Sequence, residues 1–263
     1  MTVFDSLRLD GQVALITGAS SGIGVAMAEA MAEAGADVAC AARRENLLDQ
    51  VAENLRKLGG RAVAIKTDIS KEEDVIAAVE KTVADLGRLD ILIANAGLSP
   101  EEGSLTELDS ERWRYVLHAN LDGTFFCVRE AAKVMIPRKR GKIILVSSAR
   151  GIRGDREGKK IAYASSKGGV VSMTRVLAVH LAPYGIHVNS IAPGTFRTRM
   201  LAKGALMAEP VPQEMAKQYG KVCPLQRIAE PEEIKGLTLL LASSASDYVT
   251  GQIISVDGGW TAW

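Results

Sequence analysis

A serine, a tyrosine and a lysine in the second half of the chain have the residue types and spacing needed to move a proton. Ser148 precedes the run Tyr163-Ala164-Ser165-Ser166-Lys167, in which the tyrosine and the lysine are four residues apart. On a helix this spacing places both side chains on one face. A free tyrosine has a pKa of about 10, and a neighbouring ammonium favours the phenolate. The three residues therefore predict a site in which Ser148 orients an oxygen atom and Tyr163 exchanges its proton.

The elements that must position these residues alternate along nearly the whole chain. Short runs that are apolar on both faces are separated by helical patterns, as is typical of strands covered by helices on both sides. The pattern predicts an α/β fold of Rossmann type, a doubly wound, seven-stranded parallel sheet with helices on both faces. The expected strands are Val13–Ile16, Val38–Ala42, Ala62–Ile65, Ile91–Ala94, Ile143–Val146, Val188–Ile191 and Ile253–Val256.

The chain is expected to form a single oxidoreductase domain over residues 1–263. Neither a Pro/Ser-rich linker nor a shift in composition divides it. Residues 195–230 interrupt the alternation with Pro210, Pro212 and Pro224 and have only a short helical pattern, Gln213–Tyr219. A long irregular segment inside a compact domain is usually a lid or a binding loop, so we expect a mobile substrate loop there.

Composition argues against several classes of function. The net charge is +1, so no global field favours nucleic acid or an anionic membrane. We find neither a signal-peptide pattern nor a window of about 18 apolar residues that could span a membrane. The cysteines Cys40, Cys127 and Cys223 are odd in number and far apart in sequence. We therefore expect buried reduced thiols, no metal and a cytoplasmic protein.

A glycine-rich turn links the first predicted strand to an alanine-rich helix. The turn is Thr17-Gly18-Ala19-Ser20-Ser21-Gly22-Ile23-Gly24, whose spacing departs from the G-x-G-x-x-G fingerprint. Glycines let the backbone approach a pyrophosphate, and the following helix start supplies N–H groups. The alternative is a simple strand-to-helix connection, but the position in the chain favours a cofactor site. The residues expected to bind the dinucleotide are Gly18, Ser20, Ser21, Gly22, Ile23 and Gly24.

The end of the second predicted strand favours NADP(H) over NAD(H). A carboxylate at this point would bind a free ribose 2′-hydroxyl, but the strand ends in Ala41-Ala42 and is followed by Arg43-Arg44. Asp37 precedes the strand and is expected at the opposite edge of the sheet. An arginine suits a 2′-phosphate, and we expect Arg43 to bind it. The alternative is that both arginines belong to a solvated helix start.

Taken together, these motifs resemble the classical short-chain dehydrogenase/reductase family over essentially the whole chain. Further family motifs follow in order: Asn95-Ala96-Gly97 after the fourth strand, Asn120 in a helix, Ser148-x-x-Gly151, and Pro193-Gly194. The resemblance implies a catalytic tetrad of Asn120, Ser148, Tyr163 and Lys167. The additional cofactor contacts that it implies are Asp68, Ile69, Asn95, Ala96, Gly97, Tyr163, Lys167, Pro193, Gly194 and Thr198.

The resemblance also implies a mechanism and an assembly. Lys167 would lower the pKa of Tyr163 and hold the nicotinamide ribose, while Asn120 would bind a water that links the lysine to solvent. The family's homotetramer would use the helices of residues 110–137 and 163–182 as one interface. The apolar surface expected for it is Phe125, Phe126, Val170, Val171 and Leu177. A C-terminal segment containing Trp260 and Trp263 would pack at an interface or close a site.

Basic residues cluster in the two segments that border the substrate in the family. They are Arg150, Arg153, Arg156, Lys159 and Lys160 before the tyrosine, and Arg197, Arg199 and Lys203 in the expected loop. Such a rim would attract an anionic small molecule such as a sugar acid. The alternative is an ordinary solvated surface.

The sequence therefore predicts an NADP(H)-dependent interconversion of a secondary alcohol and a ketone, resembling gluconate 5-dehydrogenase-like members. A 3-oxoacyl-carrier-protein reductase is the alternative activity, although Tyr184 stands near where that branch usually has a basic residue. A protein that senses NADP(H) without turnover is the alternative of another class, and the intact tetrad argues against it.

Overall fold

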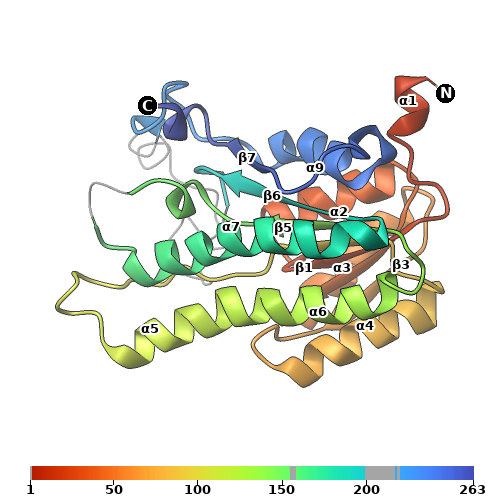
Figure 1. Ribbon diagram of the computed structural model, residues 1–263, viewed down its shortest axis with the longest axis horizontal. Coiled ribbons are helices and arrows are strands. Elements are labelled where there is room, and N and C mark those ends of the chain that lie inside the picture. Colours follow the sequence, from red (N-terminus) through yellow and green to blue (C-terminus); the bar gives the residue numbers. More distant parts are fainter. Residues whose placement is uncertain (1, 155–157, 199–216, 218–219) are drawn as a thin grey trace.

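One parallel sheet runs through the molecule. The computed structural model describes residues 2–154, 158–198, 217 and 220–263. Within these residues seven strands pair in the order β3-β2-β1-β4-β5-β6-β7 (Figure 1). The strands are β1 Val13–Thr17, β2 Asp37–Ala42, β3 Ala62–Lys66, β4 Ile91–Ala94, β5 Gly141–Val146, β6 Ile186–Pro193 and β7 Ile253–Val256. All seven predicted strands are confirmed. Strands β5 and β6 begin before their apolar cores because Lys142 and His187 pair in register at the sheet margin.

Helices cover both faces of the sheet, which confirms the doubly wound α/β fold. Helices α2, α3 and α9 bury one apolar core against it, and α4, α6 and α7 bury a second core on the other face (Figure 1). The long helices are α2 Ile23–Glu33, α3 Glu45–Arg56, α4 Glu72–Leu86, α5 Ser110–Leu117, α6 Gly123–Met135, α7 Ile161–Leu181 and α9 Lys235–Ala242. A π-helical turn, His118–Asp122, joins α5 to α6.

The strand order reverses beside β1, which pairs with β2 on one side and with β4 on the other. Chain connections leave this point in opposite directions, and in doubly wound sheets ligands bind at the carboxyl ends of the strands at such a point. The segments that begin with Gly18, Asn95 and Ser147 follow β1, β4 and β5 and meet at this end. The fold alone therefore brings the glycine turn and the predicted proton-transfer residues to one edge.

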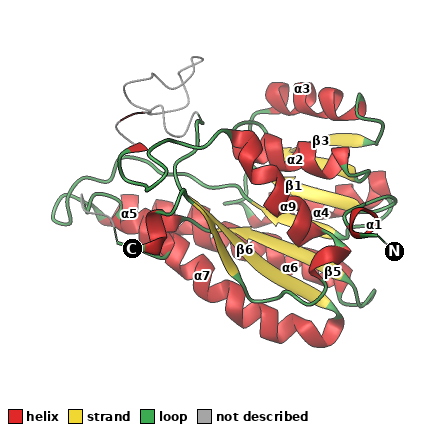
Figure 2. Cartoon of the chain, turned by 90° about the horizontal axis from the view of Figure 1, so that it is seen from above, coloured by secondary structure: helices red, strands yellow, loops and turns green. Residues whose placement is uncertain are grey.

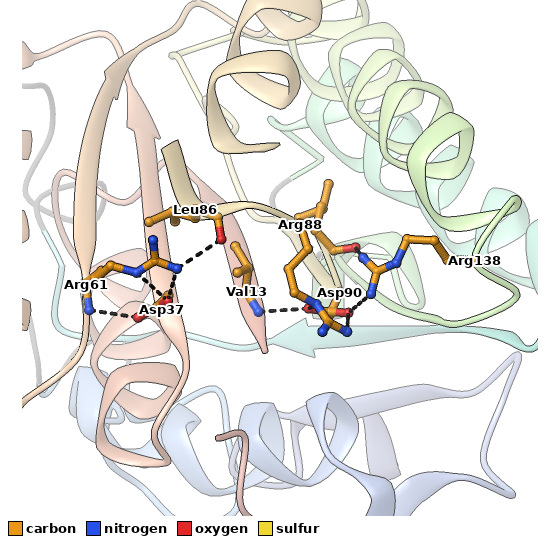
Figure 3. Close-up of polar contacts among 8 residues, drawn as sticks. Val13, Asp37, Arg61, Leu86, Arg88, Asp90 and Arg138 are labelled. Carbon is orange, nitrogen blue, oxygen red and sulfur yellow. Dashed lines mark hydrogen bonds and ion pairs between the residues drawn. The ribbon is translucent and has the colours of Figure 1, made fainter. Parts of the chain in front are cut away.

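Ion pairs lie at the opposite end of the sheet, where the strands begin. Asp90, just before β4, accepts hydrogen bonds from Val13 N and from Arg88 and Arg138 (Figure 3). Asp37, at the start of β2, binds Arg61, which confirms that this aspartate lies away from the cofactor edge. The N-terminal helix α1 (Val3–Ser6) and the C-terminus lie at opposite ends of the molecule in both views (Figures 1 and 2).

The described residues contain no helix that is both long and apolar enough to cross a membrane. In the same residues, no group of three or more His, Cys, Asp or Glu side chains is placed to hold a metal ion. Cys40, Cys127 and Cys223 are buried free thiols, as predicted.

Candidate active site

The glycine turn after β1 has a shape that only glycine permits. Gly18 and Gly22 have φ values of +71° and +62°, in the region that other residues rarely adopt. A Cβ atom added to Gly24 would lie 2.3 Å from the carbonyl oxygen of Gly18. Helix α2 begins at Ile23, and within the described residues no side chain caps it. The first N–H groups of α2 therefore face a glycine-lined cradle that fits a pyrophosphate.

Asn95 ties the turn to the end of β4. Its Nδ2 donates to the carbonyl oxygen of Thr17 at 2.9 Å, and Thr17 Oγ1 accepts from Asn95 N and Ala96 N at 3.1 Å each. A Cβ added to Gly22 would lie 3.0 Å from Cγ2 of Thr198. The structure thus places the segment after β6 against the glycine turn, as the predicted cofactor residues require.

The other predicted cofactor residues lie at or just after the carboxyl ends of β6 and β3. Pro193 is buried as the last residue of β6, and Gly194 packs so tightly that a Cβ would approach Cα of Asp257 to 2.7 Å. Asp68 Oδ1 accepts from Ser70 N and Ser70 Oγ at 3.1 and 2.8 Å. The side chain of Ile69 is buried in the core on the face of α4, α6 and α7.

The two arginines after β2 have different surroundings. Arg44 donates to Ser20 Oγ at 3.0 Å and to Ser21 Oγ at 2.6 Å, so it is not the solvated helix residue considered from sequence. Arg43 is exposed, and among the described residues its side chain makes no hydrogen bond or ion pair. Gly18 N donates to the carbonyl oxygen of Ala41 at 2.7 Å, which brings the end of β2 against the turn.

The four residues of the predicted tetrad come together. Ser148 follows β5 and is 7% exposed, and Tyr163 and Lys167 lie one turn apart on α7. Lys167 Nζ is 6.0 Å from the centroid of the Tyr163 ring and donates to the carbonyl oxygen of Val146 at 2.8 Å. A Cβ added to Gly97 would lie 3.2 Å from Asn120 Oδ1 and 3.3 Å from Lys167 Nζ. Asn120 and Lys167 therefore flank the same glycine.

The Asn120 side chain braces the site from the π-helical turn. Its Nδ2 donates to the carbonyl oxygen of Leu98 at 2.9 Å and to Ser166 Oγ at 3.1 Å, and its Oδ1 accepts from Leu98 N at 2.8 Å. Single π-helical turns are frequent at functional sites. These contacts hold together the loop after β4, the α5–α6 junction and α7.

Burial dominates the ionisation of the two central groups. It raises the pKa of Tyr163, against which a hydrogen bond with Ser148 and the charge of Arg150 act, while the charge of Glu102 acts to raise that pKa further. Burial lowers the pKa of Lys167 to about 8. On balance the pKa of Tyr163 is raised in the folded chain, and its lowering by Lys167 stays a prediction.

The basic rim is engaged with the protein rather than simply solvated. The guanidinium of Arg150 lies 5.5 Å from the Trp260 ring centroid, and that of Arg153 lies 4.7 Å from the Trp263 ring centroid. Arg153 also donates to the carbonyl oxygen of Trp260. The C-terminal tryptophans thus pack over the loop that follows Ser148 in the same chain.

Of the remaining basic residues of the rim, some are hydrogen-bonded or ion-paired, one is exposed and the others lie outside the described residues. Lys160 donates to the carbonyl oxygens of Ser99 and Pro100. Arg197 pairs with Glu230 at 2.8 Å. Lys159 is exposed. The predicted rim residues Arg156, Arg199 and Lys203 lie outside the described residues, as do Pro210, Pro212 and most of the Gln213–Tyr219 pattern.

One sequence-based expectation about α7 is wrong. Val170 and Val171 are 0% and 9% exposed, so they belong to the interior of this chain and not to an interface surface. The prediction was wrong because a mostly apolar helix does not show which of its faces meets the sheet. The two ends of the 195–230 segment are joined through a bridge between Phe196 and Ala229.

Comparison with known proteins identifies the family. The chain matches the family model described as Enoyl-(Acyl carrier protein) reductase over residues 18–261. It is 39% identical over 251 residues to the cis-4-hydroxycyclohexanecarboxylate dehydrogenase of Sinomonas cyclohexanicum, covering 95% of this chain and 97% of that one. It is 36% identical over 253 residues to a 3-oxoacyl-(acyl-carrier-protein) reductase of Thermotoga maritima, with 96% and 99% covered. A crystal structure of a short-chain type dehydrogenase/reductase from Mycobacterium marinum matches it with a TM-score of 0.92 and 36% identity over 100% of both chains.

The fold and the similar proteins define an oxidoreductase that acts on alcohol or ketone groups with a nicotinamide cofactor. The chain belongs to the short-chain dehydrogenase/reductase family.

Proposed function

We propose that this enzyme interconverts a secondary alcohol and a ketone on a small molecule that carries a carboxylate, using NADP(H). The observation that carries the substrate proposal is the position of Arg150, whose charge acts on the Tyr163 phenol and whose backbone N donates to Ser148 Oγ at 3.2 Å. A guanidinium next to the proton-transfer groups suits bidentate pairing with a carboxylate. The name of the Sinomonas relative, which contains a carboxylate, supports the same substrate class.

The proposed chemistry assigns each residue one task. When bound, the nicotinamide supplies or accepts the hydride. In the direction of reduction, the Ser148 hydroxyl orients the substrate carbonyl oxygen, and Tyr163 donates a proton to that oxygen as it becomes an alcohol. Lys167 holds the cofactor ribose and places a positive charge near the phenol. Asn120 holds a water through which solvent returns the proton, and in oxidation each proton moves in reverse.

The proposed preference for NADP(H) rests on the end of β2. Ala41 and Ala42 present no carboxylate where a ribose 2′-hydroxyl would bind, and Arg43 is exposed with its guanidinium available for a phosphate. Arg44, on the serines of the turn, adds positive charge beside the same position.

The proposed organisation is one catalytic domain with a substrate loop over residues 195–230, assembled as a homotetramer in the cytoplasm. All described strands belong to one sheet. Exposed apolar side chains on α6 and α7 would supply an interface, with Phe125, Val176 and Val179 being 43%, 65% and 78% exposed. Buried free thiols are typical of a reducing compartment.

A turnover assay with purified enzyme tests this function. Hydroxy- and keto-carboxylates, their neutral amides, and 3-oxoacyl thioesters are compared with NADP⁺/NADPH and NAD⁺/NADH. We expect kcat/KM for a carboxylate to exceed that for its amide at least tenfold, about 1.4 kcal/mol, at both low and high salt. Arg150→Ala should remove this preference, while Lys159→Ala, at an exposed rim cation, should not.

Two outcomes would replace the proposal. A preference for the acyl-carrier-protein thioester would favour the 3-oxoacyl reductase activity instead, and binding of NADPH without any turnover would favour a sensing protein. Equal rates for acid and amide would mean that the basic rim does not bind a substrate carboxylate.

A further inference from the structure

A buried carboxylate outside the predicted tetrad contacts the helix that carries Tyr163. Glu102 lies in the loop between β4 and α5 and is 5% exposed. Its Oε2 accepts from Ala162 N at 2.7 Å, and its Oε1 accepts from Tyr163 N at 2.9 Å. Both oxygens of a buried carboxylate are thus used on the backbone of the helix start that holds the proton-transfer residue.

Helix α7 needs this partner because it has no cap of its own. Its N-cap residue is Lys160, which provides no side-chain hydrogen bond to the first turn within the described residues. The first N–H groups of a helix have no acceptor inside the helix, and its N-terminus favours negative charge. Glu102 therefore replaces a local cap from about 60 residues away in the sequence.

A second contact runs between the same two segments in the opposite direction. Lys160 Nζ donates to the carbonyl oxygen of Ser99 at 3.4 Å and to that of Pro100. The loop after β4 thus caps the start of α7, and the start of α7 binds the backbone of that loop. The same loop begins with Asn95–Gly97, which border the glycine turn and Lys167.

We propose that Glu102 is a positioning residue for the proton-transfer step: it fixes the backbone of Tyr163 against the loop after β4 and sets the charge behind the phenol. This inference rests on the proposed role of Tyr163. Chemistry between a phenol and a substrate oxygen depends steeply on their distance, and a displacement of about 1 Å can reduce the rate on the order of 100-fold.

The negative charge of Glu102 acts on the ionisation of the Tyr163 phenol, in addition to capping the helix. Among the described residues, the charged groups facing Tyr163 are Lys167 on α7, Arg150 after β5 and Glu102 after β4. Arg150 favours the phenolate, and Glu102 opposes it. A neutral residue at position 102 therefore shifts the phenol toward ionisation at lower pH.

The test compares Glu102→Gln with Glu107→Gln, a matched glutamate of the same loop. Glu107 is exposed, and among the described residues its carboxylate accepts from Ser104 N and Ser104 Oγ, at 2.8 and 2.7 Å, and from no backbone N–H group of α7. Glu102→Gln should lower kcat on the order of 10- to 100-fold, leave the Kd for NADPH unchanged in a fluorescence titration, and move the ionisation limb of the kcat–pH profile to lower pH. Glu107→Gln should match the wild type in all three measurements.

A second variant keeps the proposal testable if Glu102→Gln does not fold. Lys160→Met removes the reverse contact and leaves the Glu102 charge in place, so kcat should fall while the pH limb stays where it is. A wild-type kcat in both variants would overturn the inference, and so would a fall in kcat for Glu102→Gln without a shift of the limb. Tyr163→Phe separates the two proposals: if that variant is inactive and Glu102→Gln is not, only the role of Glu102 fails.

Discussion

The two ends of the sheet differ in how their buried charged groups are hydrogen-bonded. At the amino end, the 2%-exposed carboxylate of Asp90 accepts from Val13 N at 3.0 Å, from Arg88 at 2.7 Å and from Arg138 at 2.9 Å (Figure 3). At the carboxyl end, the 4%-exposed ammonium of Lys167 donates to the carbonyl oxygen of Val146. Among the described residues no carboxylate pairs with this lysine.

The difference separates stabilising charge from functional charge. A buried carboxylate that is fully hydrogen-bonded is compensated for the loss of water. The lowered pKa of Lys167, about 8, means that the folded chain disfavours its charged form. Titratable groups whose pKa is strongly shifted are candidates for function, because a fold that keeps such a group buried is less stable for it. Mutations at the amino end should therefore reduce stability and leave turnover unchanged, whereas mutations at the carboxyl end should reduce turnover without reducing stability.

The largest effect is expected at the carboxyl end, where Tyr163→Phe removes only the hydroxyl that exchanges the proton. The turnover rate should fall about 10²–10⁴-fold or more, while the Kd for the cofactor and the free energy of unfolding change little. Steady-state kinetics, a cofactor titration and urea denaturation measure the three quantities. Activity within threefold of the wild type would show that this end is not the proton-transfer site.

Most of the fold could be predicted from the sequence because the strands are short apolar runs, of which β1, β4 and β5 are buried throughout. Their apolar runs mark them without knowledge of their neighbours, and the glycine turn locates the first crossover. The outward face of α7 could not be predicted in this way. Its apolar residues occur around the helix, so Val170 and Val171 were assigned to the surface although both are buried in this chain.

The predicted tetrad residues come together because their positions follow from strand ends and from one helical spacing. Glu102 could not be found from the sequence, because its contact with α7 joins two segments that only the tertiary fold brings together. The same holds for Arg150, which the sequence showed only as one of five basic residues before Tyr163. Its contact with the Trp260 ring also joins segments that are far apart in the sequence.

At the amino end, Asp90→Asn should reduce stability without reducing kcat. The amide cannot accept from all the donors around it, so Val13 N and one arginine lose a partner. Breaking a buried pair costs about 3–5 kcal/mol, and the lower value applies because Arg88 and Arg138 can turn to water. Urea denaturation measures the change. Glu53→Gln, which breaks the exposed pair with Lys57, is the control and should cost about 0.5 kcal/mol or less. A kcat reduced in proportion to the loss of stability would remove the contrast between the two ends.

Lys167→Met should abolish turnover and yet stabilise the protein at pH 7. Burial lowers the pKa of the lysine from 10.5 to about 8, which corresponds to a penalty of about 3 kcal/mol on its charged form. Between these two pKa values the unfolded chain binds the extra proton, so wild-type stability rises with pH there and the penalty is complete below pH 8. After the lost hydrogen bond to Val146 is subtracted, the gain at pH 7 is about 2 kcal/mol.

The pH dependence supplies the control for this variant. The stability difference between Lys167→Met and the wild type should shrink as pH rises from 8 toward 10.5, measured by urea denaturation of both proteins at each pH. A destabilised variant, or a difference that does not change with pH, would mean that the lysine is compensated in the same way as Asp90.

The smallest effect concerns the cofactor, at the edge of the carboxyl end. Arg43→Asp replaces an exposed guanidinium by a carboxylate that repels a 2′-phosphate and accepts from a ribose 2′-hydroxyl. The ratio of kcat/KM for NADPH to that for NADH should fall at least tenfold, about 1.4 kcal/mol. Arg44→Ala should reduce this ratio less, because Arg44 is bound to Ser20 and Ser21, and its loss should raise KM for both cofactors. If Arg44→Ala changes the ratio more than Arg43→Asp does, the arginine on the serines is the phosphate partner. If neither variant changes it, the end of β2 does not select the cofactor.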